Sequence, residues 1–281
     1  MKAKATTAAV AGIIASAAAQ NSTNTCATGV HLIVARGSGE APGSGRIGSV
    51  ADGVVAAVPG SQIAPINYIA TLSNYSTSVV DGTTAMKLAL TEYNLRCPQS
   101  KVALLGYSQG AHVAGDILCG SVEEEEDDGL EIDFNTTSPI PSSVVDQSVI
   151  AVVLFGDPTH NASATWNRGT STRNGLFPRE NITACEQYAP KIESWCDTGD
   201  IYCDLGNDTT VHGSYFKTYT EDAVKFVVSQ FNASKTNATS PTGTPTATPS
   251  SSVVPANGAG VTAPGAILSL AGLSMLAAYL M

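Results

Sequence analysis

The segment Gly106-Tyr107-Ser108-Gln109-Gly110 constrains the fold of this chain more than any other feature. It follows a short apolar run of strand length, residues 101–105, and precedes a helix-like segment, residues 111–118. The pattern G-x-S-x-G between a strand and a helix is typical of a nucleophile elbow, a sharp turn that exposes a serine hydroxyl at the top of a sheet. The glycines permit this turn because a side chain there would clash. We therefore predict that Ser108 is a catalytic nucleophile.

Apolar strand-like runs alternate with helix-like segments through the middle of the chain. Such alternation predicts a parallel sheet covered by helices on both faces, an α/β fold. Ligands of such sheets bind at the carboxyl ends of the strands, where Ser108 is expected. The strand-like runs are residues 30–35, 61–67, 101–105 and 149–155, and the helix-like segments are residues 47–58, 77–94, 109–119 and 221–231.

Both ends of the chain differ in composition from this central part. Residues 1–19 start with two lysines, continue as an apolar stretch and end in three alanines, which predicts a secretory signal peptide. Residues 234–257 are rich in Ser, Thr and Pro and predict an O-glycosylated stalk. The uncharged residues 258–281 predict a GPI-attachment propeptide, with attachment near Asn257 or, because the spacer is short, further upstream. Residues 26–233 remain as one domain.

The composition of the chain fits an exported glycoprotein and limits its partners. Six cysteines suit disulfides in an oxidising compartment. The net charge of −10 and the absence of clustered Lys and Arg argue against a nucleic-acid partner. The acidic run 123–128 lacks the spacing of a calcium loop and is interpreted as a solvated loop. Eight N-x-S/T sequons occur, at Asn21, Asn74, Asn135, Asn161, Asn181, Asn207, Asn232 and Asn237.

A nucleophilic serine needs a base and a carboxylate that orients the base. Of the four histidines, His31 opens the first strand at the wrong end of the sheet, and His112 would project along the helix after Ser108. The chain order Ser, Asp or Glu, His then leaves two pairs, Asp157 with His160 and Asp200 with His212.

Two observations favour Asp200 and His212 over the other pair. A glycan on the sequon at Asn161 would lie beside His160 and would crowd the nucleophile. Asp200 lies between Cys196 and Cys203, and a bond between these cysteines would close a small ring that fixes the carboxylate.

Several motifs, in the right order, resemble the cutinase and acetylxylan esterase family of serine esterases, over about residues 26–233. They are Cys196 to Cys203 followed by His212-Gly213-Ser214-Tyr215, Ala35 to Glu40 after the first strand, Cys97-Pro98, and Phe155-Gly156-Asp157-Pro158 as a structural turn.

This resemblance implies a small, lidless, three-layer α/β/α sandwich of the α/β-hydrolase type. It implies Ser108 as nucleophile, His212 as general base and acid, and Asp200 as orienting carboxylate. Backbone N–H groups of Ser38 and Gln109 would form the oxyanion hole, with the Ser38 hydroxyl assisting. It also implies the disulfides Cys26–Cys97, Cys196–Cys203 and, as the remaining pair, Cys119–Cys185.

We therefore expect a secreted serine ester hydrolase that acts on a plant cell-wall polymer or a small ester. The polar residues 207–210 beside the base resemble the acetylxylan esterases, so deacetylation of xylan is the first expectation. A cutinase or lipolytic esterase is one alternative, and a non-catalytic GPI-anchored glycoprotein on a hydrolase scaffold is another. We expect a monomer, no metal, no cofactor, and contact with membranes only through the GPI anchor.

Overall fold

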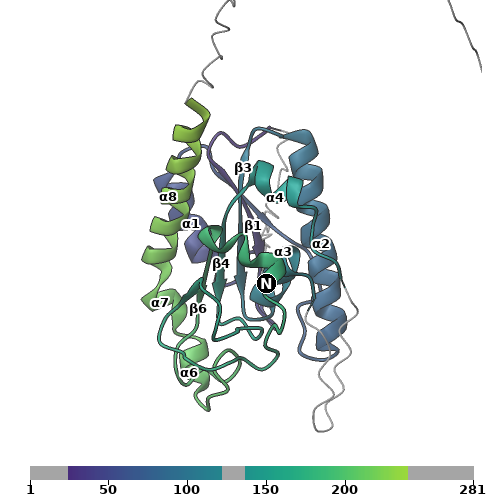
Figure 1. Cartoon of the computed structure of the whole chain (residues 1–281), viewed down its shortest axis with the longest axis vertical. Helices are drawn as coiled ribbons and strands as arrows, with labels where there is room; N and C mark the ends of the chain where they lie inside the picture. The colour runs from purple at the N-terminus through teal and green to yellow at the C-terminus, as the bar shows by residue number, and fades with distance from the viewer. Residues whose placement is uncertain (1–24, 122–136, 240–281) are drawn as a thin grey trace, which may run out of the picture. The chain divides into compact units, whose positions relative to one another are not determined.

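The structure, a computed structural model, describes residues 25–121 and 137–239 (Figure 1). The predicted signal peptide, acidic run and GPI propeptide lie outside these residues, as does most of the predicted stalk. The last helix, α8 (Thr220–Thr239), continues past residue 233, where we expected the domain to end.

Six parallel strands form one sheet in the order β2-β1-β3-β4-β6-β5. The central strands are almost entirely buried and apolar, apart from the half-buried His31 in β1 and Lys101 in β3, as expected for a parallel sheet with both faces covered. Their carboxyl ends share one edge, so residues that follow different strands meet there. The strands are β1 (Val30–Ala35), β2 (Gln62–Pro65), β3 (Lys101–Tyr107), β4 (Val149–Phe155), β5 (Asn167–Arg168) and β6 (Ile192–Trp195).

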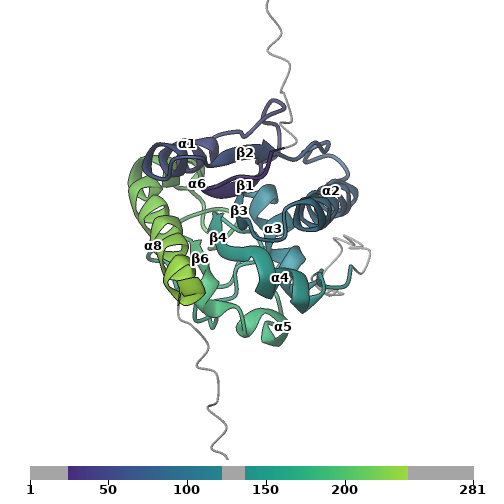
Figure 2. The ribbon, with the colours of Figure 1, turned by 90° about the horizontal axis from the view of Figure 1, so that it is seen from above.

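Helices cover the sheet on both faces and make three layers (Figure 2). Helices α1 (Gly48–Ala57) and α8 pack on one face, and α2 (Tyr75–Arg96) and α3 (Gln109–Cys119) pack on the other. The short helices are α4 (Ser142–Ser148), α5 (Thr183–Glu186), the 3-10 turn η1 (Ala189–Lys191), α6 (Thr209–His212) and α7 (Tyr215–Thr218). The expected α/β/α sandwich is confirmed.

Side chains of β1 alternate between the two cores, because successive strand residues point to opposite faces of a sheet. Leu32 and Val34 belong to the core beneath α1 and α8, while Ile33 and Ala35 belong to the core beneath α2 and α3. Both faces of β1 are therefore apolar from Leu32 to Ala35, which explains the unbroken hydrophobic sequence of these four residues after His31.

Three disulfides form among the described residues, in the pairs that the resemblance implies. They are Cys26–Cys97, Cys119–Cys185 and Cys196–Cys203, and no free cysteine is present among the described residues. Cys26–Cys97 closes a loop of 71 residues between the start of β1 and the end of α2. In the chain-entropy account, a loop of this length stabilises a protein by roughly 4 kcal/mol.

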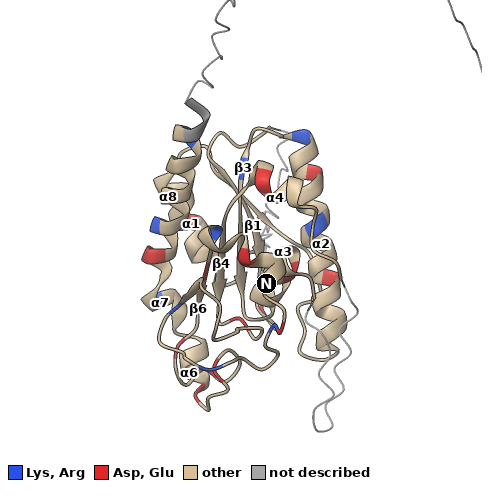
Figure 3. Ribbon diagram, viewed as in Figure 1, with Lys and Arg blue, Asp and Glu red and all other residues tan. Residues whose placement is uncertain are grey.

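Basic side chains are interspersed with acidic ones along α2 and α8 (Figure 3). Among the residues that the structure describes, no helix combines the length and hydrophobicity needed to cross a bilayer.

Candidate active site

The candidate site lies at the carboxyl edge of the sheet, where β1 and β3 run side by side. The chain leaves β1 toward β2 on one side and leaves β3 toward β4 on the other, so this is the point where the strand order reverses. Open parallel sheets bind their ligands at such a switch point. Ser38 follows β1 and Ser108 follows β3, so the two serines flank the switch point from neighbouring strands.

Ser108 occupies a strained turn between β3 and α3. Its φ of 53° and ψ of −122° lie in a region that residues with side chains rarely adopt. Its backbone N–H donates to the carbonyl of Phe155, at the end of the neighbouring strand β4 (2.8 Å). The serine is half-buried, and it directly precedes the first residue of α3. This is the geometry of a nucleophile elbow.

Asp200 and His212 form a direct hydrogen-bonded pair. His212 Nδ1 lies 2.8 Å from Asp200 Oδ2. The other carboxylate oxygen, Oδ1, accepts the backbone N–H groups of Tyr202 (2.7 Å) and Cys203 (3.1 Å). The Cys196–Cys203 disulfide encloses Asp200 in a loop of seven residues. The carboxylate is thus fixed on one oxygen by the backbone of its own ring, and on the other by the imidazole.

His212 lies against Tyr107 at the end of β3 and close to Gly156, which follows β4. Its ring centroid lies 5.1 Å from that of Tyr107, whose hydroxyl donates to the His212 carbonyl (3.0 Å). A Cβ placed on Gly156 would lie 2.9 Å from His212 Cε1, so a side chain at this position would displace the imidazole. Because Tyr107 precedes Ser108 and Gly156 follows its hydrogen-bond partner Phe155, His212 lies at the same end of β3 and β4 as the serine.

Tyr215 is a residue of this site to which the sequence analysis assigned no role. Its hydroxyl donates to Asp200 Oδ2 at 2.7 Å, the same oxygen that His212 contacts. Burial by itself raises the pKa of Asp200, but the bonds from His212, Tyr215 and the Tyr202 N–H outweigh it and lower that pKa below its ordinary value. Asp200 is therefore ionised at neutral pH, in a position with no exposed surface.

The loop after β1 carries Ser38 and is held by hydrogen bonds on both sides of this serine. The Glu40 carboxylate accepts the N–H groups of Gly37 (2.7 Å) and Arg46 (3.0 Å). The buried Arg36 guanidinium donates to the carbonyls of Glu40 and Tyr68. The Ser38 hydroxyl is buried and has no hydrogen-bond partner among the described residues. A polar group in this state is available to a bound ligand.

The Gln109 side chain is held in place from two sides. Its amide donates to the Thr71 carbonyl and its oxygen accepts from the Ser78 hydroxyl, both at 3.0 Å. Gln109 is completely buried at the first position of α3, so its backbone N–H belongs to the helix N-terminus beside Ser108. Such N–H groups stabilise negative charge.

The competing pair does not form. The Asp157 carboxylate accepts the N–H (2.9 Å) and the hydroxyl (2.6 Å) of Thr159, and neither ring nitrogen of His160 has a hydrogen-bond partner among the described residues. Burial lowers the pKa of His160 and keeps its ring neutral. Asp157 is thus a turn residue at the end of β4, and the structure brings together only the second of the two pairs.

The other two histidines have structural surroundings. His112 is fully buried in α3, within 3.3 Å of the Tyr75 hydroxyl and 3.6 Å of Asp116. His31 stacks on Tyr93 with ring centroids 3.5 Å apart, at the opposite end of β1 from Ser38.

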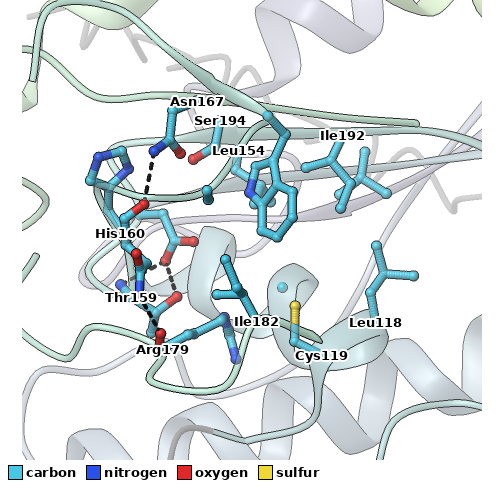
Figure 4. A pocket seen from close by; sticks show the side chains of 16 residues that line it. Leu118, Cys119, Leu154, Thr159, His160, Asn167, Arg179, Ile182, Ile192 and Ser194 are labelled. Carbon is cyan, nitrogen blue, oxygen red and sulfur yellow. Dashed lines mark hydrogen bonds between the residues drawn. The ribbon is translucent and has the colours of Figure 1, made fainter. Parts of the chain in front are cut away.

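A small cavity lies between α3 and the strands β4 and β6, and not at Ser108 (Figure 4). Its volume of about 20 Å³ has room for a single water molecule. Leu118, Trp166, Ile182 and His160 are among its lining residues, whereas Ser108, Asp200 and His212 are not. Among the described residues, no group of three or more His, Cys, Asp or Glu side chains could hold a metal ion.

Comparisons with known proteins agree with this geometry. A family model described as Cutinase matches residues 26–231. Cutinase 11 of Verticillium dahliae is 35% identical over 211 residues, which cover 73% of this chain and 69% of that protein. Acetylxylan esterase 2 of Talaromyces purpureogenus is 34% identical over 208 residues, which cover 72% of this chain and 86% of that protein.

Solved structures give the same result. An acetylxylan esterase determined at 0.90 Å resolution superposes with a TM-score of 0.66 and 33% identity, covering 74% of this chain and 100% of that chain. The catalytic core domain of acetyl xylan esterase from Trichoderma reesei gives a TM-score of 0.65 and 34% identity, covering 73% of this chain and 100% of that chain. The chain therefore belongs to the cutinase family and is a serine carboxylic-ester hydrolase.

Proposed function

We propose that Ser108, His212 and Asp200 are the catalytic triad of this esterase, and that the backbone N–H groups of Ser38 and Gln109 form its oxyanion hole. The observation that carries this proposal is the buried Asp200–His212 hydrogen bond, with the imidazole packed against Tyr107, which precedes the strained Ser108 turn, and against Gly156, which follows β4. Because Nδ1 is bound to Asp200, Nε2 remains to take the proton of Ser108.

The reaction follows from these positions. Ser108 Oγ attacks the ester carbonyl while His212 takes its proton, and the tetrahedral oxyanion is stabilised by the two N–H groups. The bond to the alcohol then breaks, and His212 returns the proton to the leaving oxygen. Water, deprotonated by His212, attacks the acyl-enzyme and releases the acid and free Ser108. Asp200 keeps the imidazole in one tautomer and stabilises its protonated form.

We propose acetylated xylan as the substrate. One of the two relatives named above is an acetylxylan esterase, and both solved structures are acetylxylan esterases, one of them a catalytic core domain. The wall next to His212 is polar, because Asp208 caps α6 through the Thr210 N–H (2.8 Å) and residues 207–210 are all exposed. Such a wall suits a short acyl group on a hydrated polysaccharide.

One observation favours a cutinase-type substrate instead. Leu176 and Leu205 are large apolar side chains with 44% and 52% of their surface exposed. Leu176 lies beside the site, since its N–H donates to the carbonyl of Tyr202 (2.8 Å), whose ring contacts His212 (centroids 4.6 Å apart). Cutinase 11 of Verticillium dahliae is about as similar to this chain, at 35% identity, as Acetylxylan esterase 2 is, at 34%. An apolar rim of this kind could bury an aliphatic chain.

A series of p-nitrophenyl esters decides between the two substrates. We expect kcat/KM to be highest for acetyl and butyryl esters and to gain little beyond them, with release of acetate from acetylated xylan. A cutinase-type wall would add about 0.8 kcal/mol, or fourfold, for each CH₂ that it buries. A rate that climbs steadily through octanoyl esters, with release of hydroxy fatty acids from cutin, would contradict the xylan proposal.

A pair of matched variants tests whether an apolar surface beside the site binds the acyl chain. Leu176→Ser removes the exposed leucine that lies beside Tyr202, and Leu88→Ser removes another exposed leucine (57%) from α2. Under the xylan proposal, neither variant changes the chain-length profile. A loss of octanoyl activity in Leu176→Ser alone would place the acyl chain against Leu176.

We also propose that the mature enzyme is secreted and carries a GPI anchor. The support is the composition of residues 1–19 and 258–281. Phosphatidylinositol-specific phospholipase C is expected to release the protein from membranes of the cells that express it. Recovery of a peptide that still ends at Met281 from the mature protein, without enzymatic release, would contradict the anchor.

A further inference from the structure

Tyr215 shares one carboxylate oxygen with the base of the proposed triad. Its hydroxyl lies 2.7 Å from Asp200 Oδ2, and His212 Nδ1 lies 2.8 Å from the same atom. Neither Tyr215 nor Asp200 has any exposed surface. Two donors therefore meet on one buried oxygen, where hydrogen bonds to a charged group are strong because water does not compete.

The hydroxyl of Tyr215 is fixed in direction. It accepts the backbone N–H of Asp197 (3.1 Å), which lies inside the Cys196–Cys203 ring. A phenol has one proton to donate, so with its oxygen accepting from Asp197 that proton goes to Asp200. Burial, together with the nearby Asp200 carboxylate, raises the pKa of Tyr215 far above its ordinary value, so the phenol keeps its proton.

We propose that Tyr215 is a positioning residue of the esterase reaction, whose hydroxyl holds the Asp200 carboxylate for His212 and withdraws part of its negative charge. The proposal rests on the triad proposed above. Holding the carboxylate keeps Oδ2 aimed at His212 Nδ1 throughout both proton transfers. Withdrawing charge makes Asp200 a weaker partner for the imidazolium.

The sign of the effect follows from the active state of the base. The reaction requires neutral His212 to accept the serine proton. Without the phenol hydroxyl, Asp200 bears more charge and stabilises imidazolium more strongly. The acid limb of the pH–rate profile then moves to higher pH.

Several other charged or titratable groups surround this pair, and none of them replaces the Tyr215 hydroxyl. Tyr107 from β3 and Tyr202 from the disulfide ring face His212 with their rings. Arg46 from the loop after β1 donates to the carbonyl of Gly213 rather than to the imidazole. The remaining groups are Asp197, which accepts from the Tyr219 hydroxyl, Asp204, which pairs with Arg173, the α6 cap Asp208, and His160.

The test compares Tyr215→Phe with Tyr219→Phe. Tyr219 undergoes the same loss of a hydroxyl, four residues further along, but its hydroxyl donates to Asp197 (2.8 Å) and not to Asp200. In Tyr215→Phe, we expect the acid limb of kcat/KM for p-nitrophenyl acetate to move up by about 0.5–1 pH unit, a three- to tenfold loss on that limb. At the pH optimum, kcat falls while KM stays within about twofold. Tyr219→Phe keeps the wild-type profile.

A second substitution keeps the inference testable if Tyr215→Phe does not fold. Tyr215→3-fluorotyrosine preserves the ring and makes the phenol a stronger donor, so the acid limb moves down instead of up. A merely structural tyrosine would produce no shifts of opposite sign. An unchanged acid limb in the variants, or an equal shift in Tyr219→Phe, would overturn the inference. Failure of the triad itself is recognised separately, as retention of activity in Ser108→Ala.

Discussion

Replacing Ser108 with alanine is expected to lower kcat for p-nitrophenyl acetate by roughly 10⁴- to 10⁶-fold, with the fold intact. The loss is large because no other group can form the acyl-enzyme, and the remaining oxyanion hole provides only residual catalysis. The fold survives because the Ser108 hydroxyl makes no capping bond to α3, and the backbone N–H that bonds to Phe155 is retained. Steady-state kinetics and thermal melting measure the two quantities.

His212→Ala and His160→Ala form the matched pair that identifies the base. Both histidines are buried, with 8% and 3% of their surface exposed, but only His212 contacts a carboxylate. His212→Ala is expected to match Ser108→Ala in kcat, because the two groups act as one unit. His160→Ala is expected to keep most of the activity. An inactive His160→Ala beside an active His212→Ala would show that the base is assigned to the wrong histidine.

A fluorophosphonate probe identifies the nucleophilic serine directly. It should label the wild-type protein on Ser108 and leave Ser108→Ala unlabelled. Labelling of another serine in Ser108→Ala would contradict the proposed nucleophile.

The sequence predicted the long elements of this fold well because their patterns are unambiguous. The runs at residues 30–35 and 149–155 are β1 and β4 to the residue, since a fully buried parallel strand is a continuous apolar run bounded by turn residues. The helix expected at residues 77–94 extends at both ends, to Tyr75 and Arg96.

The strands β5 and β6 were missed for a different reason. The strand β5 contains only Asn167 and Arg168, and β6 contains the four residues Ile192–Trp195. Such short segments carry no periodicity that could distinguish them from a loop. They are strands because β4 provides an edge for β6 to pair with, and β6 provides one for β5, which is a tertiary contact.

Some residues of the candidate site could likewise be predicted from the sequence, and others could not. The elbow was read directly from Gly106 to Gly110 because its strain demands glycines at fixed positions. The sequence favoured Asp200 over Asp157 through the sequon at Asn161 and the flanking cysteines, the family resemblance pointed the same way, and the hydrogen bonds now distinguish the two carboxylates. The role of Tyr215 could not be inferred, because its partner lies 15 residues away along a loop whose path no local pattern specifies.

Replacing Gly110 with alanine is expected to destabilise the folded state by about 3 kcal/mol or more, which corresponds to a fall of roughly 6–12 °C in Tm. A Cβ at this position would lie 2.6 Å from the carbonyl carbon of Ala35 and 2.6 Å from the carbonyl oxygen of Arg36, and closer still to the Ala35 oxygen. All three atoms are backbone, so no side-chain rotation can relieve the contact. Ala35 pairs with Gly106 in the centre of the sheet, so β1 cannot retreat without disturbing β3.

The same substitution is expected to lower kcat, because the displaced backbone leads directly into the loop that carries Ser38. Gly48→Ala is the matched control: at the first residue of α1 the added Cβ meets only the Ser44 side chain, at 2.9 and 3.9 Å. The Ser44 Cβ is fixed to the backbone, so the loop before α1 must shift slightly. Because alanine favours the helix by up to about 1 kcal/mol over glycine, the net loss of stability is expected to be smaller than in Gly110→Ala. Equal melting temperatures for the two variants would mean that α3 and β1 approach each other less closely than these contacts require. A Gly110→Ala protein that melts early yet retains full kcat at low temperature would show instead that the oxyanion loop does not depend on this contact.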